Sequence, residues 1–387
     1  PGPCCLRGRI GGRMAEREAR PAGGTRGIGS AVVLLATLAL GGAAAGVAEQ
    51  VQVPPGFRVE VFAAGLGGPR LMAWSPRGDL TVSIPGRGQV VLLPDRDRDG
   101  RADRAVVFAA DLDRPHGLAW RDGWLYVAET GRIVRLRDQD GDGRADRQEV
   151  VVADLPAGGG HWTRTITFGP DGKMYASVGS SCNVCEEADP RRAAILQFNA
   201  DGSGGRIFAR GIRNAVGLTW HPASGRLWAT NNGRDWLGDD LPPETVIVVP
   251  DGAHFGWPYC HAGHLPDPDF PREGFCARTA PPAVKMQAHS APLGLAFYTG
   301  TQFPPEYRGN LFVAFHGSWN RSVPTGYKVV RIPFQGDKPG PVLDFATGWL
   351  QGRSAWGRPV DVLVGTDGAL FVSDDGAGQI YRITYGQ

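Results

Sequence analysis

The hydrophobic positions of this chain form short apolar runs, separated by turns rich in glycine, proline and aspartate. Short runs around such turns are typical of paired β-strands, and few segments have the period of an amphipathic helix. One phrase, with polar residues ahead of an apolar run, returns six times, in residues 68–84, 114–129, 161–179, 213–233, 289–317 and 358–376. The sequence therefore predicts an all-β fold built from repeats.

The spacing of these repeats indicates how many strands each one holds. The intervals are 46, 48, 52, 77 and 67 residues when the copies are aligned on Trp74, Trp120, Phe168, Trp220, Phe297 and Val364. One four-stranded blade needs ~40–50 residues, so the two longer intervals contain insertions. Six such blades predict a six-bladed β-propeller, in which radial closure leaves only short edges.

The polar residues ahead of each run should occupy equivalent places around one central funnel. A single arginine or histidine there is usually a solvent contact, but a cation or imidazole at almost every blade predicts a binding site. Because a guanidinium fork matches a carboxylate, we expect a ligand with several carboxylates. The ring comprises Arg70, Arg114, His116, His161, Arg164, Arg213, Asn214, His289, Ser290, Arg358 and Asp361.

Three phrases, at residues 161–185, 209–222 and 231–244, resemble the glucose/sorbosone dehydrogenase family. Its members are soluble sugar dehydrogenases that use pyrroloquinoline quinone (PQQ). The resemblance covers about residues 52–385. It implies a six-bladed propeller with PQQ over the funnel, oxidation of an aldose or sugar aldehyde at C1, and an external electron acceptor. The three carboxylates and ortho-quinone of PQQ would account for the cationic ring.

The resemblance also implies roles for individual residues. His161 matches the general base, which takes the proton of the sugar hydroxyl as hydride moves to the quinone. An imidazole suits this task because its unperturbed pKa lies near 6.5. Arg213 and Asn214 match the pair that hydrogen-bonds to the quinone oxygens and stabilises the negative charge formed there.

Other cofactor contacts are less completely matched. Arg358 matches the first arginine of an Arg-x-Arg-Asp phrase that holds PQQ carboxylates, but Val360 stands where the family has the second arginine. Lys328 or Arg321, in an inserted segment, could supply the missing charge. His116 is a further candidate, chosen for its position in its blade.

The phrase at 231–244 implies a calcium ion that also contacts PQQ. By the resemblance its ligands are the backbone carbonyls of Gly233 and Arg234. Calcium takes six to eight oxygen ligands, and three aspartates follow closely, Asp235, Asp239 and Asp240. The alternative is a solvated acidic loop.

Two acidic loops, 95–103 and 138–146, have carboxylates at positions one, three, five and nine and glycine at position six. EF-hand calcium loops have this spacing. Only the second loop also has a glutamate at position twelve, so it predicts a calcium site formed by Asp138, Asp140, Asp142 and Glu149. We expect both loops at hairpin tips. The alternative is a tight acidic turn without metal.

Residues 1–48 read as upstream sequence and a secretory signal. Met14 is followed by a positive region and by the apolar stretch 28–48, which ends in small residues. The propeller would then occupy 49–387, in the periplasm or outside the cell, without stable membrane insertion. An uncleaved anchor is the alternative. The formal charge of +2 argues against a nucleic-acid surface.

Four cysteines remain after this predicted leader, Cys182, Cys185, Cys260 and Cys276. An exported protein would hold them as disulfides, and proximity favours 182–185 and 260–276 among the three pairings. A zinc site is the less favoured alternative. Glu186 follows the CxxC where haem attachment requires histidine, so a c-type haem is rejected.

The leading prediction is therefore a PQQ-dependent sugar dehydrogenase. Two other functions fit the same blades. One is a non-catalytic extracellular propeller that binds carbohydrate or protein. The other is a lactonase in which an axial calcium replaces the quinone.

Overall fold

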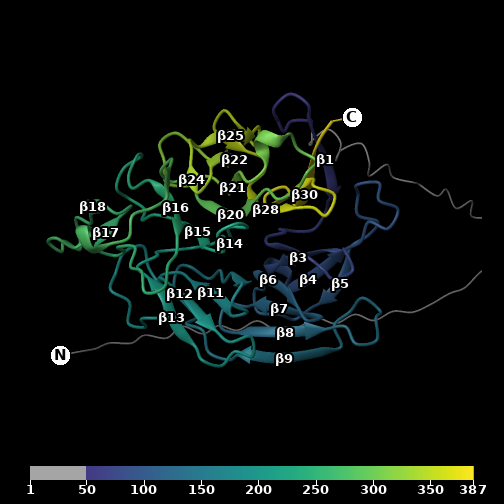
Figure 1. Ribbon diagram of the computed structural model, residues 1–387, viewed down its shortest axis with the longest axis horizontal. Coiled ribbons are helices and arrows are strands. Elements are labelled where there is room, and N and C mark those ends of the chain that lie inside the picture. Colours follow the sequence, from purple (N-terminus) through teal and green to yellow (C-terminus); the bar gives the residue numbers. More distant parts are fainter. Residues whose placement is uncertain (1–48, 387) are drawn as a thin grey trace, which may run out of the picture. The chain divides into compact units, whose positions relative to one another are not determined.

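The computed structural model describes residues 49–386, so the predicted leader at 1–48 lies outside the described residues (Figure 1). Within this range the strands form six four-stranded antiparallel sheets and three small hairpins. The six sheets are the blades of a β-propeller, which confirms the predicted fold. Short 3-10 helices occur at Pro85–Arg87, Cys276–Arg278 and Pro305–Tyr307.

The first three blades follow one another along the chain, each starting with its innermost strand. The first blade holds β2 (Met72–Trp74), β3 (Leu80–Ile84), β4 (Gln89–Leu93) and β5 (Val106–Ala109). The second holds β6 (Gly117–Arg121), β7 (Trp124–Ala128), β8 (Ile133–Arg137) and β9 (Arg147–Val152). The third holds β10 (Ile166–Phe168), β11 (Met174–Val178), β12 (Ala194–Phe198) and β13 (Arg206–Arg210).

The next two blades carry the insertions. The fourth holds β14 (Leu218–Trp220), β15 (Leu227–Asn231), β16 (Glu244–Val248) and β19 (Val284–Met286), with the hairpin β17 (Cys260–His261) and β18 (Leu265–Pro266) inserted. The fifth holds β20 (Pro292–Phe297), β21 (Leu311–Phe315), β22 (Lys328–Ile332) and β25 (Leu343–Ala346). Two more hairpins precede the sixth blade, β23 (Phe334–Gln335) with β24 (Lys338–Pro339), and β26 (Leu350–Gln351) with β27 (Ser354–Ala355). These hairpins explain the two long repeat intervals.

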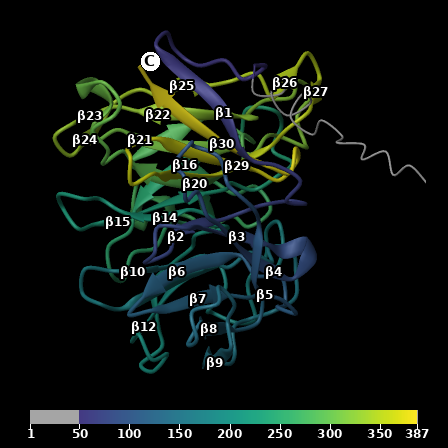
Figure 2. The ribbon, with the colours of Figure 1, turned by 90° about the vertical axis from the view of Figure 1, so that its right-hand side faces the viewer.

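The sixth blade closes the ring with strands from both ends of the described chain. Its inner strands are β28 (Pro359–Val364), β29 (Leu370–Asp374) and β30 (Gln379–Tyr385), and its outermost strand is β1 (Phe57–Ala63). Figure 2 shows the purple β1 beside the yellow β30. The two strands pair antiparallel, from Phe57 opposite Tyr385 to Ala63 opposite Ile380.

The hydrophobic core lies in the seams between neighbouring blades. Six clusters of buried side chains each join residues of two adjacent blades. The repeated tryptophans also bridge blades, because the Trp74 indole donates to the Val364 carbonyl at 2.8 Å and the Trp120 indole donates to the Thr81 hydroxyl at 2.9 Å. The aligned position is therefore an inter-blade contact as well as the end of an inner strand.

In the part of the chain that the structure describes, no helix has the length and apolar character needed to cross a membrane.

Candidate active site

A cavity of about 380 Å³ lies where the inner strands of five blades begin. The phrases ahead of β2, β10, β14, β20 and β28 supply most of its lining, as the repeat predicts. The loops after β15 and β21 supply the rest. The polar lining includes Arg70, His161, Arg213, Asn214, Asn232, Asp235, Glu244, His289, His316, Asn320 and Arg358.

His161 is held so that one ring nitrogen makes no hydrogen bond to residues 49–386. Its Nδ1 lies 2.9 Å from the Ser180 carbonyl oxygen and 3.0 Å from the Ser180 hydroxyl. Because a carbonyl oxygen only accepts, Nδ1 carries the proton and Nε2 keeps its lone pair. Burial and then the charge of Arg213 lower the pKa of His161 to about 3, so the imidazole is neutral at pH 7.

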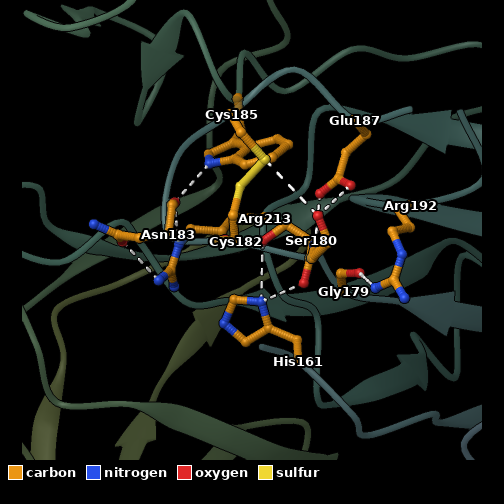
Figure 3. The surroundings of a disulfide bond; sticks show 11 residues. His161, Gly179, Ser180, Cys182, Asn183, Cys185, Glu187, Arg192 and Arg213 are labelled. Atoms are coloured by element: carbon orange, nitrogen blue, oxygen red, sulfur yellow. Dashed lines mark hydrogen bonds between the residues drawn. A yellow bond between two sulfur atoms is a disulfide. The ribbon is translucent and has the colours of Figure 1, made fainter. Parts of the chain in front are cut away.

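Arg213 is clamped by a loop that a disulfide closes (Figure 3). Its Nε donates to the Asn183 carbonyl at 2.9 Å, and one terminal nitrogen donates to Asn183 Oδ1 at 2.9 Å and to Asp235 at 2.8 Å. Asn183 lies between Cys182 and Cys185, which are bonded to each other. Cys260 and Cys276 form the second disulfide, so both favoured pairings are confirmed.

The same short loop also supports His161. The Ser180 hydroxyl donates to the Cys182 carbonyl at 2.6 Å, so its oxygen is oriented to accept from His161. The imidazole and the guanidinium that face the cavity are thus positioned by neighbouring residues of one loop.

The opposite wall carries a second set of charges. Asp375 accepts from Arg70 at 2.6 Å and from His316 Nε2 at 2.8 Å. Burial lowers the pKa of His316 to about 4 despite this carboxylate. Arg358 donates to the His316 carbonyl at 3.3 Å and makes no ion pair within residues 49–386, so its charge is available to a ligand.

The missing second arginine of the last blade is replaced by an apolar floor. Val360 is fully buried in a cluster with Leu71, Val216 and Leu293, and two of these residues line the cavity. The additional guanidinium in the cavity comes instead from Arg70, in the first blade.

Lys328 and His116 do not line the cavity, and the structure corrects both predictions. Lys328 lies on β22, and its ammonium pairs with Asp344 of the neighbouring strand at 2.6 Å. His116 is fully buried, with Nδ1 3.1 Å from the Arg164 carbonyl, and it packs edge-on against Trp162. Arg321, the other substitute considered for the missing arginine, pairs with Asp240 at 3.2 Å.

Gly233 does lie at the cavity, beside a buried carboxyl group. Its amide donates to Glu244 Oε2 at 2.7 Å, and Glu244 also lines the cavity. Burial raises the pKa of Glu244 to about 8, although the Gly233 amide and Arg213 favour the ionised form. Arg234 points its guanidinium away, to Asp267 at 2.6 Å. A proton bound to Glu244 therefore stabilises this part of the wall.

The acidic loops form compact carboxylate clusters at hairpin tips. One ligand oxygen from each of Asp138, Asp140 and Asp142 lies within 4.8 Å of the others, and the loop at 95–103 has the same arrangement. Glu149 is not part of the cluster. It lies on β9 and accepts from Arg135 at 2.7 Å, its cross-strand neighbour, so its assignment as the fourth ligand is corrected.

Several residues in or beside the cavity were not identified from the sequence. His316 and Asp375 directly follow the second strands of the last two blades, and Glu244 starts the third strand of the fourth. The repeat signal could have found the first two, since they occupy matching places after LFVAF and LFVSD. Glu244 has no such signal.

A family model described as "Domain of unknown function (DUF7133)" matches residues 45–378. The chain belongs to this family. The PQQ-dependent pyranose dehydrogenase of Coprinopsis cinerea is 27% identical over an alignment 404 residues long, and the match covers 86% of this chain and 54% of that protein. An uncharacterised protein of Borreliella burgdorferi is 37% identical over 223 residues, 55% of this chain and 57% of that protein.

A solved structure gives the same likeness in three dimensions. The holo form of the PQQ domain of the Coprinopsis cinerea pyranose dehydrogenase has a TM-score of 0.74 and 25% identity, and the match covers 86% of this chain and 97% of that one. The resemblance to PQQ-dependent sugar dehydrogenases is thereby confirmed. The chain spans little more than half the length of the curated relatives.

Proposed function

We propose that this protein is a PQQ-dependent dehydrogenase that oxidises an aldose or sugar aldehyde at C1 and passes the electrons to an external acceptor. The main support is a neutral His161 in the same cavity as the guanidinium groups of Arg70, Arg213 and Arg358. A neutral base beside cations suits a reaction that removes a proton while negative charge gathers nearby.

The cavity residues fit PQQ. Its three carboxylates match three guanidinium groups, of which Arg358 has no carboxylate partner in the described residues. Asn214 lines the cavity, and its side-chain NH2 group makes no hydrogen bond within residues 49–386, so this amide can donate to a quinone oxygen. We assign Arg213, Asn214, Arg358 and Arg70 to hold the cofactor. When bound, PQQ would accept the hydrogen of C1 with its electron pair.

His161 would take the proton of the sugar C1 hydroxyl at Nε2. The bond from Nδ1 to Ser180 fixes the ring and its tautomer, so that the lone pair of Nε2 remains available. The guanidinium of Arg213 would stabilise the negative charge that develops in the site as the electrons leave the sugar. An aldose would leave the site as its lactone.

Calcium is the second proposed cofactor. We assign the carbonyls of Gly233 and Arg234 to a calcium ion at the cavity wall, as the resemblance implies, because Gly233 lines the cavity and calcium accepts backbone carbonyl ligands. The acidic loop at 138–146 is a separate candidate calcium site, to which we assign a stabilising role and no part in the reaction. The two disulfides support a periplasmic or secreted location.

The test is to add PQQ and calcium to the purified protein and to measure cofactor absorbance and sugar oxidation with an artificial acceptor. Arg358→Ala should weaken PQQ binding by about 1.5–3 kcal/mol, the range for a hydrogen bond to a charged group. The matched control is Arg226→Ala, which removes a surface arginine paired with Asp337.

Two results would replace the proposal with an alternative. Sugar binding without PQQ binding or oxidation would indicate a non-catalytic propeller. Calcium-dependent hydrolysis of a lactone without PQQ would indicate a lactonase.

A further inference from the structure

Two tryptophans stand exposed at the edge of the cavity. Trp236 is 66% exposed and Trp319 is 65% exposed. Their ring centroids lie 5.1 Å apart with the planes at 87°. Trp319 also lines the cavity. Indoles are large apolar groups that proteins usually cover, so an exposed pair beside a cavity indicates a binding surface.

The two indoles are held together by polar contacts between their loops rather than by burial. Asn320, next to Trp319, donates to Asp235, next to Trp236, at 2.9 Å. Further along the same loops, the Ser322 amide donates to Asp239 at 3.0 Å. The pair is therefore preorganised, and a ligand would lose little loop freedom on binding.

The backbone conformation of Trp236 supports a functional role for this pair of tryptophans. Its φ is +72°, in the left-handed region that bulky residues seldom adopt. Residues in such conformations cluster at ligand sites, where the surroundings enforce them. The preceding residue, Asp235, pairs with Arg213 at 2.8 Å. The position of the indole is thus tied to the cavity wall.

We propose that Trp236 and Trp319 form a subsite for a second pyranose ring, so that the protein binds a di- or oligosaccharide whose reducing end occupies the cavity. A pyranose presents apolar C–H faces that stack on an indole and hydroxyls around its rim. Asp240, whose side chain is 87% exposed, offers acceptors in the same loop as Trp236. That the reducing-end ring in the cavity is the one oxidised rests on the proposed function.

The surroundings favour a sugar over a protein partner. A stable protein interface buries ~800 Å² on each partner and is depleted of charge at its centre. Here the charged residues Asp239, Asp240 and Arg321 lie in the same two loops as the indoles, and the side chain of Asp240 is exposed. Small aromatic platforms with charged and polar neighbours suit carbohydrate instead.

The test is titration of the apo-protein with maltose, cellobiose and glucose, followed by tryptophan fluorescence and calorimetry. We expect at least one disaccharide to bind more tightly than glucose. Trp236→Ala should reduce the disaccharide-to-glucose affinity ratio by about two- to tenfold, the effect of one aromatic contact, and Trp236→Phe should restore most of it. Val323→Ala removes a 62% exposed apolar side chain near Trp319 and should leave the ratio unchanged.

Equal affinity for glucose and both disaccharides, or a ratio that Trp236→Ala does not change, would overturn the proposal. The proposal would also be overturned if the only defect of Trp236→Ala were slower reoxidation by a protein acceptor such as cytochrome c, because that result identifies a protein docking surface. Indole-dependent disaccharide binding without any PQQ-linked oxidation would keep the subsite and reject the proposed function. PQQ-linked sugar oxidation, together with a disaccharide-to-glucose affinity ratio that Trp236→Ala leaves unchanged, would keep the proposed function and reject the subsite.

Discussion

Burial controls the protonation of the cavity histidines more than ion pairing does. His161 and His316 have pKa values lowered to about 3 and about 4, and burial is the larger cause for both. His316 donates from Nε2 to Asp375, so its Nδ1 keeps a lone pair as well. His161 is assigned the proton transfer because it lies in the phrase that matches the general base of the family and because its Nε2 makes no hydrogen bond to the described residues.

Replacing His161 by Gln should lower kcat by roughly 10²–10⁴ while PQQ still binds, because the change removes the base and leaves the arginines in place. Steady-state kinetics and a PQQ absorbance titration measure the two effects. His264→Gln, at an exposed histidine bonded to Ala262, is the control. Near-normal turnover of the His161 variant would remove the base assignment.

Asn183 acts on the reaction through Arg213. In the wild type, Asn183 Oδ1 accepts from Arg213 at 2.9 Å and from the Asp235 amide at 2.8 Å. Asn183→Ala removes both hydrogen bonds. The free energy of unfolding should fall by about 1.5–3 kcal/mol, and PQQ binding should weaken. Chemical denaturation and cofactor titration test this. Asn183→Asp keeps the oxygen, so equal losses in both variants would contradict the assignment.

Among the elements, the hairpin tips show how a sequence motif depends on its setting. In an EF-hand the residue at position twelve begins a helix and turns back to the ion. Here the loop leads into β9, whose alternating side chains direct Glu149 to Arg135 across the strand pair. The carboxylates of the loop remain clustered without it.

Calcium should therefore stabilise the protein through Asp138, Asp140 and Asp142 but not through Glu149. At a concentration 100 times Kd the gain is about 2.7 kcal/mol, because the ion binds only the folded loop. Asp140→Ala should reduce the calcium-dependent rise in Tm, and Glu149→Gln should retain it. Calorimetric scans with and without calcium decide this, and an equal loss in both variants would restore Glu149 as a ligand.

For the whole molecule, the repeat was enough to predict the blade number and most of the cavity. All six aligned residues lie on inner strands, where the side chain at that position contacts the preceding blade. The last blade's outer strand, β1, was not predicted, because it precedes the first repeat and pairs with β30 only after ring closure. Likewise, Lys328 and His116 had suitable chemistry, but sequence position could not reveal that Lys328 pairs with Asp344 or that His116 is buried against Trp162.

The buried histidines should make the apo-protein sensitive to acid. The unfolded chain takes up a proton on His316 near pH 6.5, whereas the folded protein does so only near pH 4. Unfolding therefore binds protons between these values, and stability falls as pH decreases. From pH 7 to pH 5 this residue should cost about 2 kcal/mol. Denaturant titrations of the wild type and His316→Gln should show a smaller pH dependence in the variant, and identical slopes would contradict this.

The pairing of β1 with β30 has a consequence for how the protein is made. Phe57 and Tyr385 are register partners although almost the entire described chain separates them. The sixth blade cannot be completed while the ribosome still holds residues 379–385, so the blades synthesised first must wait in an open array. Secretion through a narrow channel before folding is compatible with this order of events. Ring closure then becomes the step that commits the chain to its native state.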